Sequence, residues 1–324
     1  MQALTIYQQR GHAVESEHPI SAVLCNHAGD VLERIGAPMK TTWRSAAKPF
    51  QLEANLEILP GKLWGTLDDS ALAVGAASHN GEAIHVAQVQ KLLSHFELSE
   101  SELQCGSHWP VHLPTKERML ALGQPCRAVH NNCSGKHAFM LAASQSLGAP
   151  SNYLDPSHPV QQRIELNIAK RTHSPLLPSV TDGCGVPCFV LPLRGMAAAW
   201  ASLGEEMNHQ ERPLGRIGVA MTNAPHLVSG TDRLDSGVAQ FRTSPLLTKV
   251  GAGGLICGAL PGRDLGFAIK VRTGVGEMRP VATWAVLNQW FPGILSEEGL
   301  TPWLGIKNVA GAEVGLRIPQ WSPS

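Results

Sequence analysis

A serine and a lysine lie three residues apart in the segment 44–50, and together they could form a nucleophile and its base. On a helical turn, Ser45 and Lys48 would share a face. A lysine amine can take the serine proton only if burial or a nearby cation lowers the amine pKa. Because Pro49 would clash with the Ser45 carbonyl in a regular helix, we expect a tight turn over 45–48 and a helix from about Pro49. Ser45 would then lie at a helix N-terminus, where free N–H groups favour a developing oxyanion.

Two further motifs follow in the order used by serine β-lactamases and penicillin-binding proteins. Ser-x-x-Lys alone is weak evidence, since a chain of this size is expected to contain one by chance. Residues 78–80 match Ser-x-Asn, although they could also form an ordinary polar turn, and residues 249–251 match Lys-x-Gly. Lys270 on a later predicted strand competes with Lys249, which we favour because a glycine follows it at the required position. The ordered trio indicates a serine hydrolase site.

A second cluster of reactive side chains could bind a metal. Residues 130–137 bring Cys133, Lys136 and two histidines together before an apolar run, and the glycine-rich segment 181–187 carries Asp182 and Cys184. Thiolates with nitrogen or oxygen donors suit zinc, but Cys-x-x-Lys is not a standard metal spacing. Spacing alone therefore leaves three readings open: a metal site, buried thiols, or a Cys/His nucleophile pair. The last would leave the serine and lysine motifs without a role.

Composition excludes several classes of partner. Charged residues are 16% of the 324-residue chain, with 26 basic against 26 acidic, so no charge excess indicates nucleic acid or an anionic membrane. A small neutral or zwitterionic ligand fits better. The length suffices for a substantial core, and without a linker or internal repeat we expect residues 1–324 to form a single catalytic domain.

The compartment follows from the N-terminus and the cysteines. The first residues lack the basic and apolar regions of an export signal, and no stretch has the 18 or so apolar residues of a membrane span, so we expect a soluble, cytoplasmic protein. An odd number of scattered cysteines argues against a disulfide framework. The seven are Cys25, Cys105, Cys126, Cys133, Cys184, Cys188 and Cys257.

The first half of the chain must position these groups mainly with helices. Apolar runs at 22–24 and 31–32 flank a turn-like segment and predict a hairpin. From 45 to about 175 the pattern is mostly helical, with one apolar face running from Val86 to Phe96. Ser99 and Glu102 form a plausible capping box for the next helix.

The second half returns to strands. Residues 188–191 predict a strand and 196–203 a helix, and then apolar runs at 246–250, 255–260 and 265–271 alternate with glycine-rich turns, as in an antiparallel meander. A helix over 278–291 would cover that sheet, and the tail 319–324 is expected to be frayed. We therefore predict an α/β sandwich with a helical lobe inserted between N- and C-terminal strands.

Taken together, six segments resemble the rhizobial-type, class 3 L-asparaginases, a family similar in fold to serine β-lactamases and glutaminases. The block from His130 to His137 is the most specific of them, and chance matches in all six places would be improbable. The segments are 44–51, 78–82, 130–137, 182–187, 230–233 and 249–251.

The resemblance implies a role for each motif residue. Ser45 with Lys48 would form one serine–lysine pair, and Ser78 with Lys249 would supply the other. It also implies zinc as cofactor and a homodimer. Zinc would be held by Cys133, Lys136 and Cys184, with Asp182 orienting a bound water, and lysine would have to be neutral to bind it. The same motifs supply our candidates for substrate contacts, which are Arg44, His79, Asn80 and Asn132.

We therefore expect hydrolysis of L-asparagine to L-aspartate and ammonia through an acyl-enzyme. Two positions depart from the family pattern and bear on substrate range and rate: Gly253 replaces a common acidic residue, and Phe139 replaces a usual glycine. The alternatives are a serine amidohydrolase acting on glutamine or a lactam, and a non-catalytic zinc- or ligand-binding member of the fold.

Overall fold

Both ends of the chain contribute to one eight-stranded sheet. A computed structural model describes residues 2–174 and 179–323, and over these ranges the strand order is β11-β12-β1-β3-β2-β10-β9-β8. Neighbouring strands pair antiparallel along their length, with a single parallel bridge between β1 and β3. The strands are β1 (Gln2–Arg10), β2 (Ala13–Cys25), β3 (Val31–Ile35), β8 (Leu247–Gly251), β9 (Leu255–Ala259), β10 (Gly266–Val271), β11 (Gly305–Lys307) and β12 (Glu313–Pro323).

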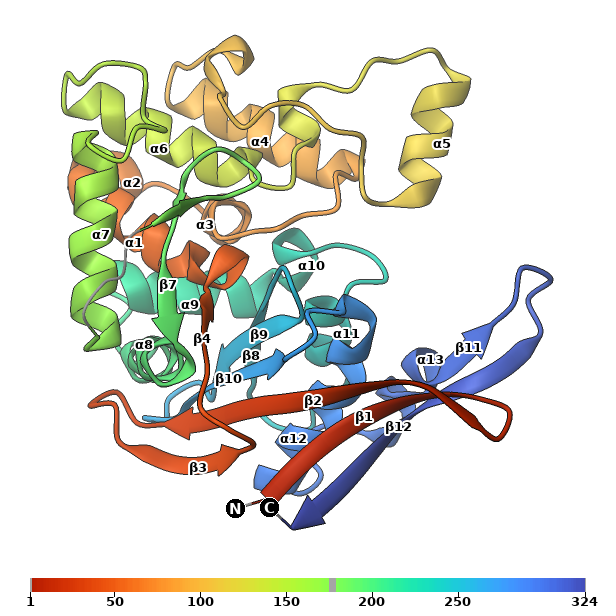
Figure 1. Cartoon of the computed structure of the whole chain (residues 1–324). Coiled ribbons are helices and arrows are strands. Elements are labelled where there is room, and N and C mark those ends of the chain that lie inside the picture. The colour runs from red at the N-terminus through yellow and green to blue at the C-terminus, as the bar shows by residue number, and fades with distance from the viewer. Residues whose placement is uncertain (1, 175–178, 324) are drawn as a thin grey trace.

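The two terminal strands lie side by side, as the N and C marks of Figure 1 show. β1 pairs with β12 from Gln2 opposite Pro323 to Arg10 opposite Gly315. The expectation of a frayed tail was therefore wrong for residues 319–323, while Ser324 lies outside the described residues. The reason is a missed partner, because β1 was not predicted and only its presence satisfies the backbone groups of the tail.

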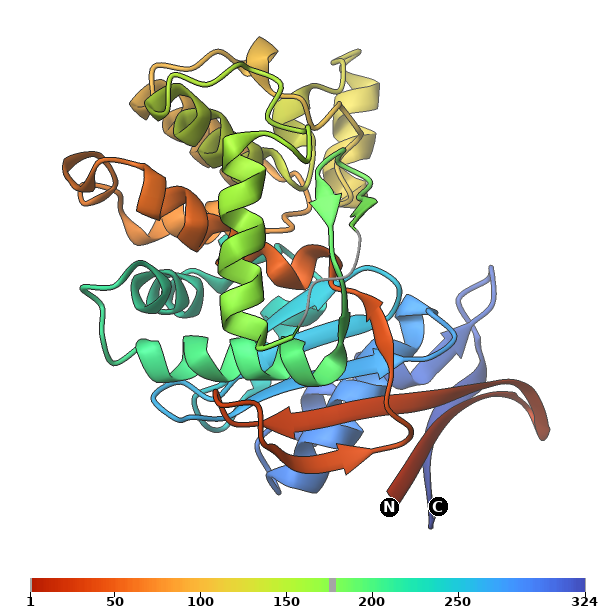
Figure 2. The ribbon, with the colours of Figure 1, turned by 60° about the vertical axis from the view of Figure 1, so that its left-hand side comes forward.

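Helices cover both faces of the sheet. The helix α8 (Leu193–Glu206) packs on β2, β9 and β10 from one side, and α12 (Arg279–Trp290) packs on β9, β10 and β12 from the other. Figure 2 shows the two helices on opposite sides of the sheet. The strands between them alternate, so that Ala268 faces the core under α8 while Phe267 and Ile269 face the core under α12.

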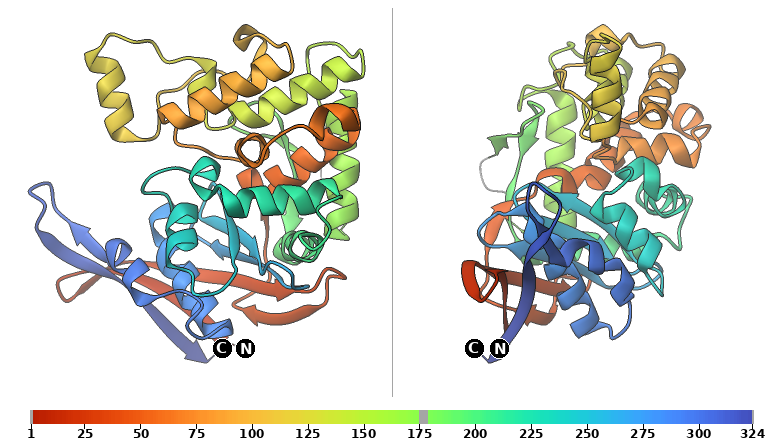
Figure 3. Two further views of the ribbon diagram at one scale, coloured as in Figure 1. Left: turned by 180° about the vertical axis from the view of Figure 1, so that it is seen from behind. Right: turned by 90° about the vertical axis from the view of Figure 1, so that its right-hand side faces the viewer.

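A lobe of helices stands on the α8 side of the sheet, as Figure 3 shows from behind. Its centre is α1, which packs on α6, α7 and α9. The predicted α/β sandwich with an inserted helical lobe is confirmed. The helices are α1 (Lys48–Ile58), α2 (Gly61–Trp64), α3 (Asp69–Gly75), α4 (Ala83–His95), α5 (Leu113–Ala121), α6 (Ser134–Ser146), α7 (Pro159–Thr172), α9 (Pro213–Asn223), α10 (Pro225–Val228), α11 (Leu234–Phe241) and α13 (Thr301–Leu304).

Most predicted elements are present, with two differences. The expected strand over 188–191 is divided into β6 (Pro187–Cys188), paired with β5 (Val180–Thr181), and β7 (Val190–Pro192), paired with β4 (Lys40–Thr42). The capping box at Ser99 is present, but it caps only the 3-10 turn η2 (Glu100–Glu102). Within the described ranges no helix combines the length and apolar character needed to cross a bilayer.

Phe139 joins three helices of the lobe. It lies on α6, is fully buried, and its ring stands edge-on to Phe96 with the centroids 5.4 Å apart. A Cβ built on Gly75, at the end of α3, would lie 2.5 Å from the Phe139 ring, so the absence of a side chain at Gly75 makes room for the aromatic ring. The departure at 139 is thus accommodated by packing within the core.

We predict that Phe139→Ala lowers the free energy of unfolding by about 3–5 kcal/mol, because the missing ring leaves a cavity between α3, α4 and α6. Urea unfolding followed by circular dichroism measures the loss. The control is Gly253→Asp in the exposed turn after β8, where φ is +69° and nothing lies near a Cβ; it should cost no more than ~1–2 kcal/mol. Equal losses in the two variants would contradict a central packing role for Phe139.

Candidate active site

Ser45 lies where β4 leads into the helical lobe. The 3-10 turn η1 (Arg44–Ala47) runs directly into α1, which begins at Lys48 with Pro49 in its first turn, as predicted. Arg44 has a left-handed backbone with φ of +50°, a conformation that costs a non-glycine residue about 1–3 kcal/mol. The turn also packs against β8, because a Cβ on Gly251 would lie 3.1 Å from the carbonyl oxygen of Trp43. Ser45 is therefore held between the start of α1 and the edge strand β8.

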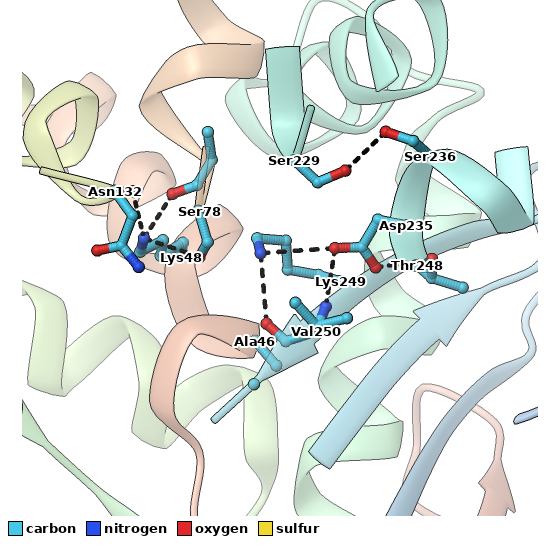
Figure 4. A network of polar contacts seen from close by, with 12 residues as sticks. Ala46, Lys48, Ser78, Asn132, Ser229, Asp235, Ser236, Thr248, Lys249 and Val250 are labelled. Atoms are coloured by element: carbon cyan, nitrogen blue, oxygen red, sulfur yellow. Dashed lines mark hydrogen bonds and ion pairs between the residues drawn. The ribbon is translucent and has the colours of Figure 1, made fainter. Parts of the chain in front are cut away.

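The Lys48 side chain is buried and is held by oxygen atoms on three sides. Its Nζ donates to the Ser78 Oγ at 2.9 Å, to the Asn132 carbonyl oxygen at 3.3 Å and to the Ala77 carbonyl oxygen. Figure 4 shows Lys48 directed at Ser78 and Asn132. Burial lowers the pKa of Lys48. In the described parts of the chain the Ser45 hydroxyl has no hydrogen-bond partner, so the observed partner of Lys48 is Ser78.

Lys249 reaches the same region from β8 and is also buried. Its Nζ lies 3.7 Å from the Asp235 carboxylate and 3.3 Å from the Val250 carbonyl oxygen (Figure 4). Asp235, in the first turn of α11, also accepts the Val250 N–H at 3.1 Å and the Thr248 hydroxyl at 3.0 Å. Burial lowers the pKa of Lys249 to about 7 against the effect of Asp235, and the charge of Lys48 lowers it further. Proton exchange near neutral pH is therefore available at Lys249.

The two residues after Ser78, His79 and Asn80, line one side of the site and are held in place by contacts with other elements. The His79 ring stacks on His85 with centroids 5.1 Å apart, and its Nε2 is 3.0 Å from the Ser134 Oγ. Burial, followed by the charge of His85, holds the pKa of His79 well below its usual range, so the ring is neutral. Asn80 donates to the Thr231 carbonyl oxygen at 3.1 Å.

Gly230 is required where Asn80 meets the loop before α11. It has a φ of +105°, and a Cβ there would lie 2.3 Å from the Asn80 Oδ1. Glycine at this position therefore permits both the left-handed backbone and the close approach of the Asn80 side chain.

The predicted metal ligands meet in a buried cluster. The Lys136 Nζ donates to the Cys184 Sγ at 3.1 Å, and the Cys133 Sγ donates to the Asn132 Oδ1 at 3.3 Å. A hydrogen bond with Cys184 holds the pKa of Cys133 well below its usual range, whereas the same contact and burial raise that of Cys184. Burial acts to lower the pKa of Lys136, but the charges of Cys184 and Cys133 outweigh it and raise the pKa.

This donor set would suit zinc with the Lys136 amine neutral, a state that the neighbouring thiols disfavour by raising its pKa. Two sulfur atoms and one nitrogen atom converge from α6 and from the loop before β6, and three protein ligands leave a fourth position open, as in catalytic zinc sites. Asp182 is engaged beside the cluster, where its Oδ1 accepts the Arg44 Nε at 2.7 Å and the Gly183 N–H at 2.7 Å. The carboxylate thus ties the turn that carries Ser45 to the loop that carries Cys184.

The structure brings the predicted site residues to one region but pairs them differently from the prediction. Ser78 was expected to pair with Lys249, whereas its hydroxyl accepts from Lys48, and no hydrogen bond within the described ranges joins Ser78 to Lys249. Asp235 was missed, although it follows the quoted segment 230–233 closely. Lys270 donates to the Val271 carbonyl oxygen on β10, two strands from β8, and no contact among the described residues joins it to Lys48 or Ser78.

Comparison with solved structures gave matches of low identity. The structure of Mglu in its native form in the presence of 4.3M NaCl has 15% identity and a TM-score of 0.38, and the match covers 86% of this chain and 62% of that one. This chain thus spans less than two thirds of the length of Mglu. A β-lactamase from Mycobacterium bovis has 13% identity and a TM-score of 0.42, with 84% of this chain and 94% of that chain covered.

Comparison with protein families gave a match over nearly the whole chain. No curated protein matches at a significant level. The family described as L-asparaginase II matches residues 6–315, a range that includes all six motif segments and confirms the resemblance to asparaginases. The chain therefore belongs to the L-asparaginase II family.

Proposed function

We propose that the chain hydrolyses the side-chain amide of L-asparagine, with Ser45 as nucleophile. One observation carries this proposal: the buried amine of Lys48, one helical turn after Ser45, donates to two carbonyl oxygens and the Ser78 hydroxyl, and no carboxylate among the described residues pairs with it. Burial lowers its pKa although the neighbouring Cys133 thiol acts in the opposite direction. A buried amine without a bound carboxylate loses its proton more readily than an exposed one, and a general base requires that property. Membership of the L-asparaginase II family supports the same class of reaction.

The acylation step uses residues from three elements. The Ser45 Oγ attacks the amide carbon while its proton passes to Lys48, directly or through Ser78, whose hydroxyl lies 2.9 Å from the Lys48 Nζ. The C–N bond then breaks and ammonia leaves with a proton from the lysine. Free N–H groups at the start of α1 would stabilise the oxyanion.

The deacylation step restores the serine. Water attacks the acyl carbon, the C–O bond to Ser45 breaks, and the proton of the water returns through the lysine to the Ser45 Oγ, which releases L-aspartate. The Lys249 amine lies 3.7 Å from Asp235 and has a pKa of about 7, so it can gain or lose a proton near neutral pH. Its position on β8 beside η1 suits stabilisation of the tetrahedral intermediate.

We also propose that Cys133, Lys136 and Cys184 hold zinc. A bound zinc ion would supply Lewis-acid polarisation of a substrate oxygen and help to orient the substrate. The residues around it act independently of the ion: Arg44, held by Asp182 beside Ser45, can bind a substrate carboxylate, and Asn132 offers an amide toward the same region.

We predict that Ser45→Ala lowers kcat for asparagine by at least about a thousandfold, because the variant lacks the oxygen that forms the acyl bond. Ammonia release measures the rate, and acid-quenched intact-protein mass spectrometry detects the acyl-enzyme.

Ser78→Ala is the matched control, because Ser78 is the serine whose hydroxyl accepts a hydrogen bond from Lys48. This variant should turn over slowly but still acquire the adduct on Ser45. An adduct that persists in Ser45→Ala and disappears in Ser78→Ala would instead assign Ser78 as the nucleophile. Parallel assays with glutamine establish which amide is preferred.

The lowered pKa of Lys249 predicts a pH-dependent stability. The folded state holds this amine at a pKa of about 7, below the value of 10.5 expected in the unfolded chain. Between these values the unfolded chain binds more protons, so this lysine destabilises the fold at pH 7 and below, and the destabilisation disappears as the pH rises toward 10.5. The unfolding free energy of the parent minus that of Lys249→Met should rise from pH 7 to 10 by up to about 1.4 kcal/mol per pH unit. The exposed substitution Lys62→Met should show no such slope, and a flat result for Lys249→Met would refute the shift.

Zinc binding is predicted at roughly one ion per chain by elemental analysis. The double variant Cys133→Ser, Cys184→Ser should lose the metal, because serine hydroxyls replace both sulfur donors, and should bind asparagine more weakly while keeping detectable turnover through Ser45 and Lys48. Cys126→Ser, at a half-buried cysteine outside the cluster, should retain the metal. If the parent protein contains no metal, or if the double variant is fully active, the proposed zinc site is wrong and both cysteines are ordinary buried thiols.

A further inference from the structure

A cavity of about 270 Å³ lies beside the end of β8, where α11 and α12 begin. Its charged lining residues come from two segments: Asp232 and Arg233 precede α11, while Glu277 and Arg279 lie at the start of α12. Val250 and Trp303 contribute apolar walls. This volume leaves room for a small organic molecule.

Three of the four charged side chains, those of Asp232, Arg233 and Glu277, make no hydrogen bond or ion pair within the described residues, and Arg279 uses only part of its donor capacity. Across residues 2–174 and 179–323, no ion pair involves Asp232, Arg233, Glu277 or Arg279. The Arg279 Nη1 donates to the Gly251 carbonyl oxygen at 2.8 Å, which fixes the guanidinium, but its buried Nε has no hydrogen-bond partner among the described residues. Burial lowers the pKa of Arg279, and the charge of Arg233 lowers it further, whereas the carboxylates of Asp235 and Glu277 act in the opposite direction.

The charge pattern selects one class of ligand. Two guanidinium groups can bind a carboxylate through paired N–H donors, and two carboxylates can accept from an ammonium group. A phosphate or a dicarboxylate would meet Asp232 and Glu277, and a metal cation would meet Arg233 and Arg279. A molecule that carries one carboxylate and one ammonium satisfies both pairs.

The cavity is connected to the site of Ser45 through β8. Val250 lines the cavity and directly follows Lys249, and its N–H donates to the Asp235 carboxylate that pairs with that lysine. Arg279 holds Gly251, the glycine that packs on the backbone before Ser45. Occupation of the cavity therefore acts on the same strand that positions Lys249.

We propose that this cavity binds the zwitterionic head group of an α-amino acid. This amino acid is a separate molecule from the one that is hydrolysed, because asparagine has one carboxylate and Arg44 is placed beside Ser45 to bind it. Binding does not require the proposed hydrolysis, so it can be measured in protein that cannot turn over.

The test measures glycine binding to Ser45→Ala protein by titration calorimetry. Glycine has the head group and no amide, and saturable binding is expected, with acetate and methylammonium, which each carry one of the two charges, at least tenfold weaker. Arg233→Gln, and separately Asp232→Asn with Glu277→Gln, should each weaken glycine binding at least tenfold, the effect of about 1.4 kcal/mol. These side chains make no hydrogen bond in the described structure, so the fold should be preserved, which circular dichroism checks.

Arg263→Gln is the matched control, because Arg263 lines a separate cavity of about 430 Å³ that has no carboxylate in its lining. It should leave glycine binding unchanged. In the active parent, glycine should change the rate of asparagine hydrolysis without competing with asparagine, whereas simple competition would place the glycine in the substrate site and overturn the proposal. Absence of saturable binding, or cavity variants that bind glycine as tightly as the Ser45→Ala protein, would overturn the proposal even if Ser45 proves catalytic.

Discussion

Burial of positively charged amines between the helical lobe and the sheet is the constraint on which the rest of the structure depends. Moving an ammonium out of water costs several kcal/mol unless other groups compensate it. Three lysines here are compensated in three ways: Lys48 by carbonyl and hydroxyl oxygens, Lys249 by Asp235, and Lys136 by the sulfur of Cys184. Each arrangement changes the pKa of its lysine differently: the pKa of Lys48 and Lys249 is lowered and that of Lys136 is raised.

The fold supplies these compensating groups from parts of the chain that are far apart. Lys48 depends on the end of α3 and the segment before α6, Lys249 depends on α11, and Lys136 depends on the loop before β6. Arg44 and Asp182 link the first of these regions to the last. A displacement of any one element would therefore leave a buried charge without its partner. Because an unpaired buried charge is costly, we expect the lobe and the sheet to fold cooperatively.

The sequence predicted an element correctly where the pattern that indicates it is local. The apolar period of α4, the meander β8–β10 and the effect of Pro49 on the start of α1 all depend on neighbours within a few residues. The prediction failed where the decisive partner is remote. The contact of Lys48 with Ser78, the pairing of Lys249 with Asp235, and the register of β1 with β12 depend on how separate elements meet. The spacing of residues along the chain does not determine which remote elements come into contact. The roles of the site residues stay predictions.

The pairing of β1 with β12 has a consequence for how the chain folds during synthesis. Gln2 and Pro323 are Cα partners, so β1 acquires β12 as a neighbour only after all the elements between them have been synthesised. Contacts of such large sequence separation carry a high loop-closure entropy and form slowly. Until then one edge of β1 presents unpaired N–H and C=O groups, which favour association with other strands. The same proximity means that a short linker could join the two ends, and new termini in an exposed loop of the helical lobe would let the sheet close early.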